Sequence, residues 1–307
     1  MRSKSPYGPY EWKRVLERGK TTMNGPHQGG WIHTKYSEDW FIHFQDKGPY
    51  GRVCHLQPVD WSSGWPVMGN AGEPYWKFRK PKSDSKTIVN PVETDEFDSS
   101  KLGMQWQWQN DYKESYGQAT SMGFFRLFTY ALPELGDVSN LWYVPNMLLQ
   151  KIPADEFTAT TKLSFCSRNS DQYVGLVCMS AEYSSVGLQR TEDGYELQIR
   201  HNPNAMRTHL TDEVLTVDTL KPTQKGTPRK GRPAEMHIKD VYLRMSIKDS
   251  KVNYAYSIDG KKWKKAGGEY AMGKGRWIGS KIGFFAVDPN KTGRKGFIDI
   301  DWFRISR

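Results

Sequence analysis

Three short stretches near the start of the chain alternate apolar and polar side chains with a period of two. They are residues 31–34 (WIHT), 39–46 (DWFIHFQD) and 52–59 (RVCHLQPV), and turns rich in glycine or charge bound each of them. Such alternation buries one face of a β-strand and leaves the other face in water. The pattern therefore predicts one small antiparallel sheet within residues 24–61. A further strand is expected before it, over residues 11–17 (EWKRVLE).

A second region, from about residue 96 onward, consists of many short alternating segments with almost no helical periodicity. The segments are residues 104–110, 124–131, 158–165, 173–180, 185–191, 195–201, 241–248, 252–259, 281–287 and 297–305. Gly, Asn, Asp or Ser separates most of them, which is typical of a β-sandwich. Asp259-Gly260 is a strong hairpin signal. Residues 81–95, rich in Lys, Ser, Asp, Thr and Pro, read as a linker between the two regions.

Charge and hydropathy narrow the possible partners. The formal net charge is +10, but Lys and Arg are scattered along the chain, and the one dense run, residues 221–232, is rich in Pro, Gly and Thr. This composition favours a solvated loop, so nucleic-acid binding is the weakest hypothesis. No apolar run reaches the length of a membrane span, and no signal-peptide core is visible. We expect no membrane span.

The three cysteines have no C-x-x-C spacing. Cys54, Cys166 and Cys178 all lie in apolar strand contexts, so the sequence indicates neither a zinc site nor a disulfide framework. Cys166 and Cys178 could face each other across neighbouring strands. Small buried hydrophobic residues are the simpler interpretation for all three.

Residues with site-like chemistry gather around the first predicted sheet. Loop 24–30 (NGPHQGG) presents His27 and Gln28 among glycines that allow a ligand to approach closely. Arg52 opens a strand directly after a Gly-Pro-Tyr-Gly turn. It can cap the sheet through a surface ion pair, or present its rigid fork to a sugar hydroxyl or a carboxylate. Trp31 can stack on a sugar ring or pack within the sheet.

The carboxylates and other histidines of this region read as less site-like. Glu38 and Asp39 fall in a predicted hairpin turn and Asp60 at a strand end, so we expect solvated positions for them. Asp46, in a turn, either accepts hydrogen bonds from backbone amides or braces Arg52. The remaining histidines occupy strand positions, without the spacing of a transition-metal site: His33, His43 and His55.

Four motifs of this region resemble the C-terminal part of glycoside hydrolase family 43, the β-xylosidases and α-L-arabinofuranosidases. They are G-P-H-Q-G-G-W (25–31), H-F-Q-D-K-G-x-Y-G-R (43–52), H-L-Q-P-x-x-W (55–61) and W-P-V-x-G (65–69). The resemblance implies that residues 1–80 form the final blade of a five-bladed β-propeller. It places His27 near the propeller axis, often beside calcium, and Arg52 in the sugar pocket. Gln28 and Trp31, beside His27 in the same stretch, are further substrate-binding candidates.

The catalytic groups of that family are three carboxylates on earlier blades, which the resemblance does not place on this chain. Hydrolysis of a glycosidic bond requires a carboxyl group on each side of the anomeric carbon. We therefore expect no catalytic residue here and little or no activity from residues 1–307 alone. The upstream propeller blades of the same enzyme are the expected partner.

Residues 96–307 resemble the concanavalin A-like (jelly-roll) β-sandwich that ends family 43 xylosidases, from EFDSSKLGMQWQWQN to GFIDIDWFRIS. In the last strand, Asp299 and Asp301 alternate with isoleucines, so both should point to one face. They either ligate calcium, together with oxygens from residues 96–98, or form a polar outer face.

The sequence therefore predicts an all-β protein with a partial propeller at residues 1–80, a linker at 81–95 and a sandwich at 96–307. The expected function is that of the C-terminal portion of a glycosidase acting on xylosyl or arabinosyl groups of hemicellulose. Its ligand would be a xylo- or arabino-oligosaccharide, in a periplasmic or extracellular setting. The alternative is a sandwich that binds carbohydrate without cleaving it.

Overall fold

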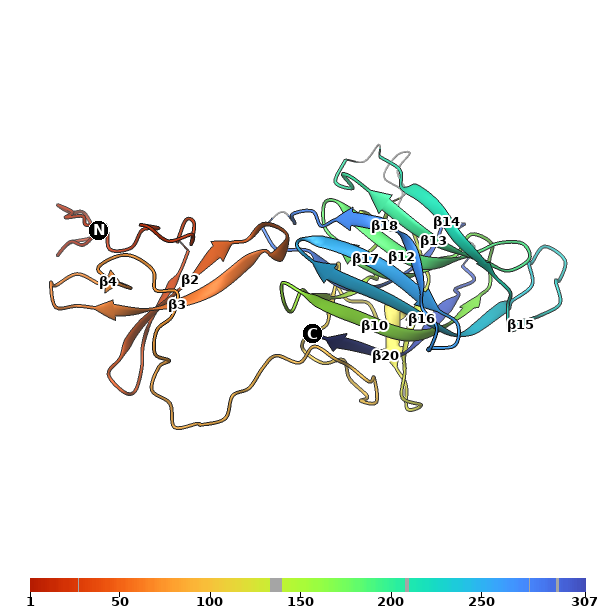
Figure 1. Ribbon diagram of the computed structural model, residues 1–307, viewed down its shortest axis with the longest axis horizontal. Helices are drawn as coiled ribbons and strands as arrows, with labels where there is room; N and C mark the ends of the chain where they lie inside the picture. Colours follow the sequence, from red (N-terminus) through yellow and green to blue (C-terminus); the bar gives the residue numbers. More distant parts are fainter. Residues whose placement is uncertain (27, 133–139, 208–209, 276, 291–292) are drawn as a thin grey trace. The chain divides into compact units, whose positions relative to one another are not determined.

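The chain divides into two compact units, residues 1–89 and 90–307, which we describe separately. The structure is a computed structural model, and it describes residues 1–26, 28–132, 140–207, 210–275, 277–290 and 293–307. Strands dominate both units (Figure 1), and the helical elements within the described residues are three short 3-10 turns: η1 (Gly48–Tyr50), η2 (Glu114–Tyr116) and η3 (Leu141–Tyr143). Across the described residues, no helix has the length and apolar character needed to cross a bilayer.

The first unit is built on one antiparallel sheet whose spatial order follows the sequence, β1-β2-β3-β4. Its strands are β1 (Gly30–His33), β2 (Asp39–Asp46), β3 (Arg52–Asp60) and β4 (Val67–Met68). The three alternating segments of the sequence correspond to β1, β2 and β3, so the prediction of a small antiparallel sheet is confirmed. The predicted strand at residues 11–17 is wrong, because only Glu11 forms a bridge, to Arg2, and the residues after it are irregular.

The second unit contains two eight-stranded sheets within the described residues. Sheet A has the order β18-β17-β16-β10-β20-β7-β6, with β15 beside β16. Its strands are β6 (Gly117–Ala119), β7 (Phe125–Phe128), β10 (Phe157–Ser167), β15 (Gln224–Lys225), β16 (Met236–Lys248), β17 (Lys251–Ser257), β18 (Lys264–Ala271) and β20 (Phe297–Ser306). The predicted hairpin at Asp259-Gly260 is confirmed, since it joins the antiparallel pair β17 and β18.

Sheet B has the order β14-β13-β12-β11-β19-β9-β5, with β8 parallel to β19. Its strands are β5 (Gln107–Trp108), β8 (Tyr130–Ala131), β9 (Leu148–Lys151), β11 (Tyr173–Met179), β12 (Tyr183–Arg190), β13 (Tyr195–Asn202), β14 (Glu213–Leu220) and β19 (Lys281–Asp288). With sheet A it forms the predicted sandwich. Strands β9 and β14 of this sheet, like β6 and β15 of sheet A, were not among the predicted segments.

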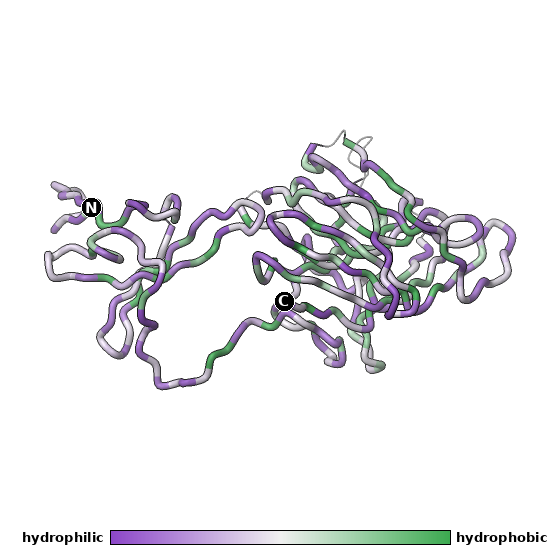
Figure 2. The backbone as a smooth tube through the Cα atoms, viewed as in Figure 1, coloured by the Kyte–Doolittle hydropathy of each residue, from purple (hydrophilic) through white to green (hydrophobic). Residues whose placement is uncertain are grey.

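The core lies between sheets A and B. Along β10, fully buried residues alternate with half-buried ones, as expected of a strand with one face inside. Aromatic rings join the two sheets: Phe165 of β10 lies 5.3 Å from Tyr195 of β13, and Phe303 of β20 lies 5.5 Å from Phe284 of β19, between ring centroids. In Figure 2 the apolar stretches of this unit concentrate in its strands and hydrophilic residues predominate in its loops.

The outer face of sheet B is covered as well. Leu141, Val144 and Met147, from the segment before β9, form a second buried cluster with Tyr173 and Phe285 of the sheet. The segment is fixed by Asn140, whose side chain accepts a hydrogen bond from the Trp142 amide. Central strands β11 and β19 are therefore buried on both faces, which explains their nearly continuous burial.

The cysteines are all free thiols. Cys166 lies on β10 of sheet A and Cys178 on β11 of sheet B, so they do not face each other across neighbouring strands. Both are buried, as the simpler interpretation expected. Cys54 is exposed, and that part of the interpretation is wrong. It lies on β3, on the same face as Leu56, which is 37% exposed.

Candidate functional site

Arg52 is held at the edge where the β2–β3 hairpin turns. Pro49 sits within the 3-10 turn that precedes it, and Gly51 has a φ of +77°, which favours glycine. The guanidinium donates a hydrogen bond from Nη1 to Oε1 of Gln28 at 3.2 Å and lies 4.3 Å above the ring of Phe44. These contacts orient the planar fork while the residue remains exposed. An arginine fixed in this way can donate to a hydroxyl or carboxylate ligand.

Gln28 approaches Arg52 because its loop runs close to the sheet. Its own φ is +51°, an unusual value for a residue with a side chain. A Cβ on the neighbouring Gly29 would lie 2.2 Å from the carbonyl oxygen of Ile42, so only glycine allows this approach. The structure thus brings together two of the predicted substrate-binding residues. His27 lies outside the described residues, and its role stays a prediction.

Trp31 lies at the other end of the sheet from Arg52. Its indole N–H donates to Oδ1 of Asp39 at 2.8 Å, and its ring packs edge-on against Trp61 at 5.4 Å. In the register of the sheet, Trp31 is opposite Phe41, and Phe41 is opposite Gln57. Gln57 lies about 16 Å beyond Arg52 along the extended strand β3, so Trp31 and Arg52 are far apart. More than half of the Trp31 side chain is exposed. A single monosaccharide would not touch both Trp31 and Arg52.

Asp46 caps its own turn rather than bracing Arg52. Its Oδ1 accepts from the amide of Gly48 at 3.0 Å, and its backbone exchanges hydrogen bonds with the side chain of Asn24. Asp46 and Arg52 are opposite in register, but no hydrogen bond or ion pair joins them among the described residues. The structure therefore favours the first of the two alternatives for Asp46.

Glu38 departs from the expectation of a solvated turn. Its side chain is 8% exposed and pairs with Arg79 at 2.6 Å. It also accepts from the backbone N–H of Lys82 at 2.9 Å and from the indole of Trp40. The Lys82 amide lowers the pKa of Glu38, with Arg79 adding to the effect although burial opposes it. The residues that bury it come from the irregular segment after β4, whose path the local sequence does not reveal.

A stacked histidine pair in the same sheet, His43 buried and His55 partly buried, was not recognised in the sequence. His43 and His55 are opposite each other on β2 and β3, with their rings stacked 5.5 Å apart. Nε2 of His55 lies 3.1 Å from Oε1 of Gln45, whose amide group donates to the carbonyl of Thr22. Burial lowers the pKa of both histidines. The histidine pair can be predicted only if the register between β2 and β3 is known, and the sequence does not reveal that register.

Asp299 and Asp301, the candidate calcium ligands of the sandwich, are both engaged by cations. The carboxylate of Asp299 makes a bidentate pair with Arg126, at 2.7 and 2.8 Å, and Asp301 pairs with Lys162 at 2.9 Å. Glu96, from the segment expected to add oxygens, pairs with Arg304. These residues do not fit a calcium ion well, because each carboxylate would have to leave a basic partner first. The paired state corresponds to the polar outer face.

Among the described residues of the second unit, a groove is lined by side chains of the kinds that carbohydrate binders use. Its walls include Trp108, Tyr112, Gln118 and Phe125, around a cavity of about 360 Å³. The rings of Trp108 and Tyr112 are 5.8 Å apart, and Tyr112 is 59% exposed. Aromatic faces beside an amide side chain can stack on a sugar ring and hydrogen-bond its hydroxyls.

Comparison with known proteins assigns the second unit to a known domain family. The family described as "Beta xylosidase C-terminal Concanavalin A-like domain" matches residues 94–306. A putative beta-xylosidase of Xylanibacter ruminicola is 31% identical over 290 residues, which are 92% of this chain and 49% of that protein. A beta-xylosidase of Formosa agariphila is 29% identical over 333 residues, covering 99% of this chain and 52% of that protein.

The likeness extends through the first unit. The solved structure of the family 43 protein BlXynB from Bacillus licheniformis has a TM-score of 0.76 at 25% identity, covering 99% of this chain and 58% of that one. The chain thus spans about half the length of the curated relatives it matches. It belongs to glycoside hydrolase family 43, through the concanavalin A-like domain found at the C-terminus of the family's β-xylosidases.

Proposed function

We propose that this chain provides the C-terminal portion of a glycosidase that removes xylosyl or arabinosyl groups from hemicellulose or its oligosaccharides. The names of its relatives, which include beta-xylosidases and an alpha-L-arabinofuranosidase of Bacteroides ovatus, support this substrate class. The catalytic acid and base would come from propeller blades on the N-terminal side of the first unit. Residues 1–307 alone should have little or no activity.

The observation that carries the proposal is the arrangement of Arg52 with Gln28. The Arg52 side chain is oriented by the Gln28 amide and the Phe44 ring but remains exposed. It is therefore suited to hydrogen-bond a polar group of a sugar or of an adjoining blade. We propose that Arg52 donates to a sugar hydroxyl or orients one of the carboxylates of the adjoining blades. We propose that the neighbouring loop residue His27 contributes to the same pocket and lies near the propeller axis, where it could contact a bound calcium ion.

The sheet of the first unit supports its proposed role as a final propeller blade. Ile42 and Leu56 are directly opposite each other on β2 and β3 and are 39% and 37% exposed. With Ile32 of β1, which is 47% exposed, they leave part of an apolar sheet face uncovered. Blades of a propeller bury such faces against one another. The preceding blade of the same enzyme is the proposed occupant of this face.

The test compares residues 1–307 with a chimera in which the N-terminal half of the Formosa agariphila beta-xylosidase precedes Met1. Both proteins are assayed on nitrophenyl β-xyloside and nitrophenyl α-L-arabinofuranoside. General acid–base catalysis contributes about 10²–10⁴ in rate, so the chain alone should be inactive and the chimera active. Robust turnover by residues 1–307 would contradict the proposal.

A matched pair of variants in the chimera tests the role of Arg52. Arg52→Ala should lower kcat/KM by about 100-fold, since it removes a charged hydrogen-bond donor from the pocket. Arg14→Ala is the control, because Arg14 is exposed and pairs only with Glu17 among the described residues. If the two variants are equally active, Arg52 does not contribute to the sugar pocket and this part of the proposal is wrong.

The second candidate function is carbohydrate binding by the sandwich without cleavage. The groove at Trp108 and Tyr112 is the observation that favours it. Binding of xylo-oligosaccharides to residues 1–307, measured by calorimetry and lost in Tyr112→Ala, would support this function. Tyr7→Ala, at an exposed tyrosine of the first unit, is the control.

A further inference from the structure

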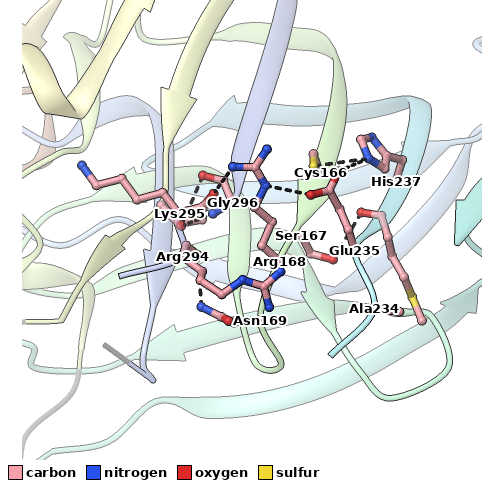
Figure 3. Close-up of polar contacts among 12 residues, drawn as sticks. Cys166, Ser167, Arg168, Asn169, Ala234, Glu235, His237, Arg294, Lys295 and Gly296 are labelled. Atoms are coloured by element: carbon pink, nitrogen blue, oxygen red, sulfur yellow. Dashed lines mark hydrogen bonds and ion pairs between the residues drawn. The ribbon is translucent and has the colours of Figure 1, made fainter. Parts of the chain in front are cut away.

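Three side chains with different metal-ligand chemistry meet at one end of sheet A. Cys166 of β10 is directly opposite His237 of β16, and Glu235 precedes His237 by two residues (Figure 3). Glu235 directly precedes β16, where alternation places it on the same face as His237, and cross-strand pairing adds Cys166 to that face. Phe165 points inward to Tyr195, so Cys166 points to the other face of the sheet. The Cys, Glu and His ligand atoms all lie within 4.8 Å of one another.

The spacing of these atoms is close to that of a tetrahedral zinc site. Zn–S and Zn–N bonds of about 2.3 and 2.0 Å place sulfur and nitrogen about 3.5 Å apart in a tetrahedron. Sγ of Cys166 lies 3.4 Å from Nε2 of His237. The other measured edge, from Nε2 to Oε1 of Glu235, is 2.9 Å and would have to open by about half an ångström. Rotation of the Glu235 side chain, which is partly exposed, provides that change.

We propose that Cys166, Glu235 and His237 bind one zinc ion, with a water molecule in the fourth position. Thiolate, imidazole and carboxylate together suit zinc, whereas calcium and magnesium prefer sites made of oxygen alone. The ion would connect β10 with the start of β16.

The surrounding structure holds the ligands in place. The carbonyl of Glu235 accepts from the Gly226 amide at 2.8 Å, and the carbonyl of His237 accepts from the Thr223 amide at 2.8 Å. Nε of Arg168 donates to the second carboxylate oxygen of Glu235 at 2.9 Å, which leaves Oε1 directed to His237. Such second contacts to a ligating carboxylate are common in metal sites. The ligand backbone is therefore fixed before any ion binds.

The protonation states of Cys166 and Glu235 determine which proton zinc must displace on binding. Burial, and then the carboxylate of Glu235, raises the pKa of the Cys166 thiol to about 12. Burial opposes ionisation of Glu235, but hydrogen bonds from His237 and Arg168 leave its pKa lowered. The metal-free site therefore holds a thiol and a carboxylate. Zinc binding forms the Zn–S bond as the thiol proton leaves to solvent, and the Zn²⁺ charge is balanced by thiolate and carboxylate.

The test uses residues 1–307, stripped of metal by a chelator and then titrated with zinc or cobalt. Equilibrium dialysis should give one zinc per chain at micromolar free metal. The cobalt form should show the charge-transfer absorption of a thiolate–cobalt bond. Cys166→Ser and His237→Gln should each weaken zinc binding at least about 100-fold, since even residues behind metal ligands contribute about 10- to 100-fold.

Two controls separate this site from adventitious binding. Cys178→Ser removes the other buried thiol, whose cross-strand partners Ser184 and Ile282 are not metal ligands. His201→Gln removes a histidine that lies between Glu182 and Glu213, at 3.3 and 3.1 Å. Neither variant should change the zinc affinity or the cobalt spectrum. The proposal is overturned if wild-type protein binds no stoichiometric zinc, if the cobalt form lacks the thiolate band, or if Cys166→Ser binds zinc as wild type does.

Discussion

The contact between Trp106 and Asp95 should contribute strongly to the stability of the sandwich. The indole N–H of Trp106 donates to Oδ2 of Asp95 at 2.7 Å, while the backbone of Asp95 exchanges two hydrogen bonds of 2.8 Å with Phe303 on β20. The Trp106 ring is buried against Phe97, Phe284 and Phe303, at centroid distances of 5.3–5.9 Å. One side chain thus connects the entry segment of the second unit to both sheets.

Two substitutions separate packing from hydrogen bonding at this contact. Trp106→Ala removes a buried aromatic side chain and should lower the free energy of unfolding by about 3–5 kcal/mol. Trp106→Phe keeps most of the ring but leaves the Asp95 carboxylate without its indole donor. A hydrogen bond to a charged group contributes about 1.5–3 kcal/mol, and we expect a loss in this range.

The measurement is urea unfolding of residues 1–307, followed by far-ultraviolet circular dichroism, with the transition of the second unit fitted separately. Trp302→Phe is the matched control, because Trp302 lies on the outer face of sheet A beside Tyr242 and Arg304. It should cost less than about 1 kcal/mol, as outer-face substitutions usually do. If Trp106→Phe costs no more than Trp302→Phe, the Asp95 hydrogen bond does not stabilise the unit and the reasoning is wrong.

Three further predictions concern single sites. Burial lowers the pKa of His43 and His55 from 6.5 in the folded first unit. The unfolded chain therefore binds more protons than the folded one just below pH 6.5. The free energy of unfolding should decrease as the pH falls from 6.5 toward the pKa values of the folded histidines. Urea titrations should show a smaller decrease in His43→Phe. Asp299→Asn should cost about 1 kcal/mol in thermal unfolding, because it removes a partly exposed bidentate pair with Arg126; an unchanged Tm would contradict this. Gly175→Ala should cost at least about 1–3 kcal/mol, since its Cβ would lie 2.1 Å from a carbonyl oxygen of β12; wild-type stability would refute the expected overpacking.

Periodicity alone predicted much of the sandwich. In the last strand it placed Ile298 and Ile300 on the buried face, and both are fully buried. It could not show that the register between β10 and β20 shifts after Lys162, which leaves Asp301 at a β-bulge. A bulge depends on two strands about 140 residues apart, whereas alternation is read from one strand at a time.

The candidate sites were less predictable for the same reason. Arg52 and Gln28 were identified through their motifs, and the contact between them follows from how closely the loop approaches β2. Cys166 and His237 are separated by 71 residues, and only the register of β10 with β16 makes them opposite. Residue spacing in sequence reveals metal sites when the ligands share a turn or helix, and misses those assembled by strand pairing.

The position of β20 in sheet A also has a kinetic consequence. Sheet A places β20 between β10 and β7, so that hydrogen bonds on both sides of Phe297–Ser306 join it to strands far away in sequence. Such long-range pairing requires large loops to close before any contact is gained, and it slows folding. The first unit, whose strands pair in sequence order, needs only local turns. We expect the first sheet to form early and sheet A to stay split, with β7 and β10 exposing unpaired edges, until residues 297–306 insert between them.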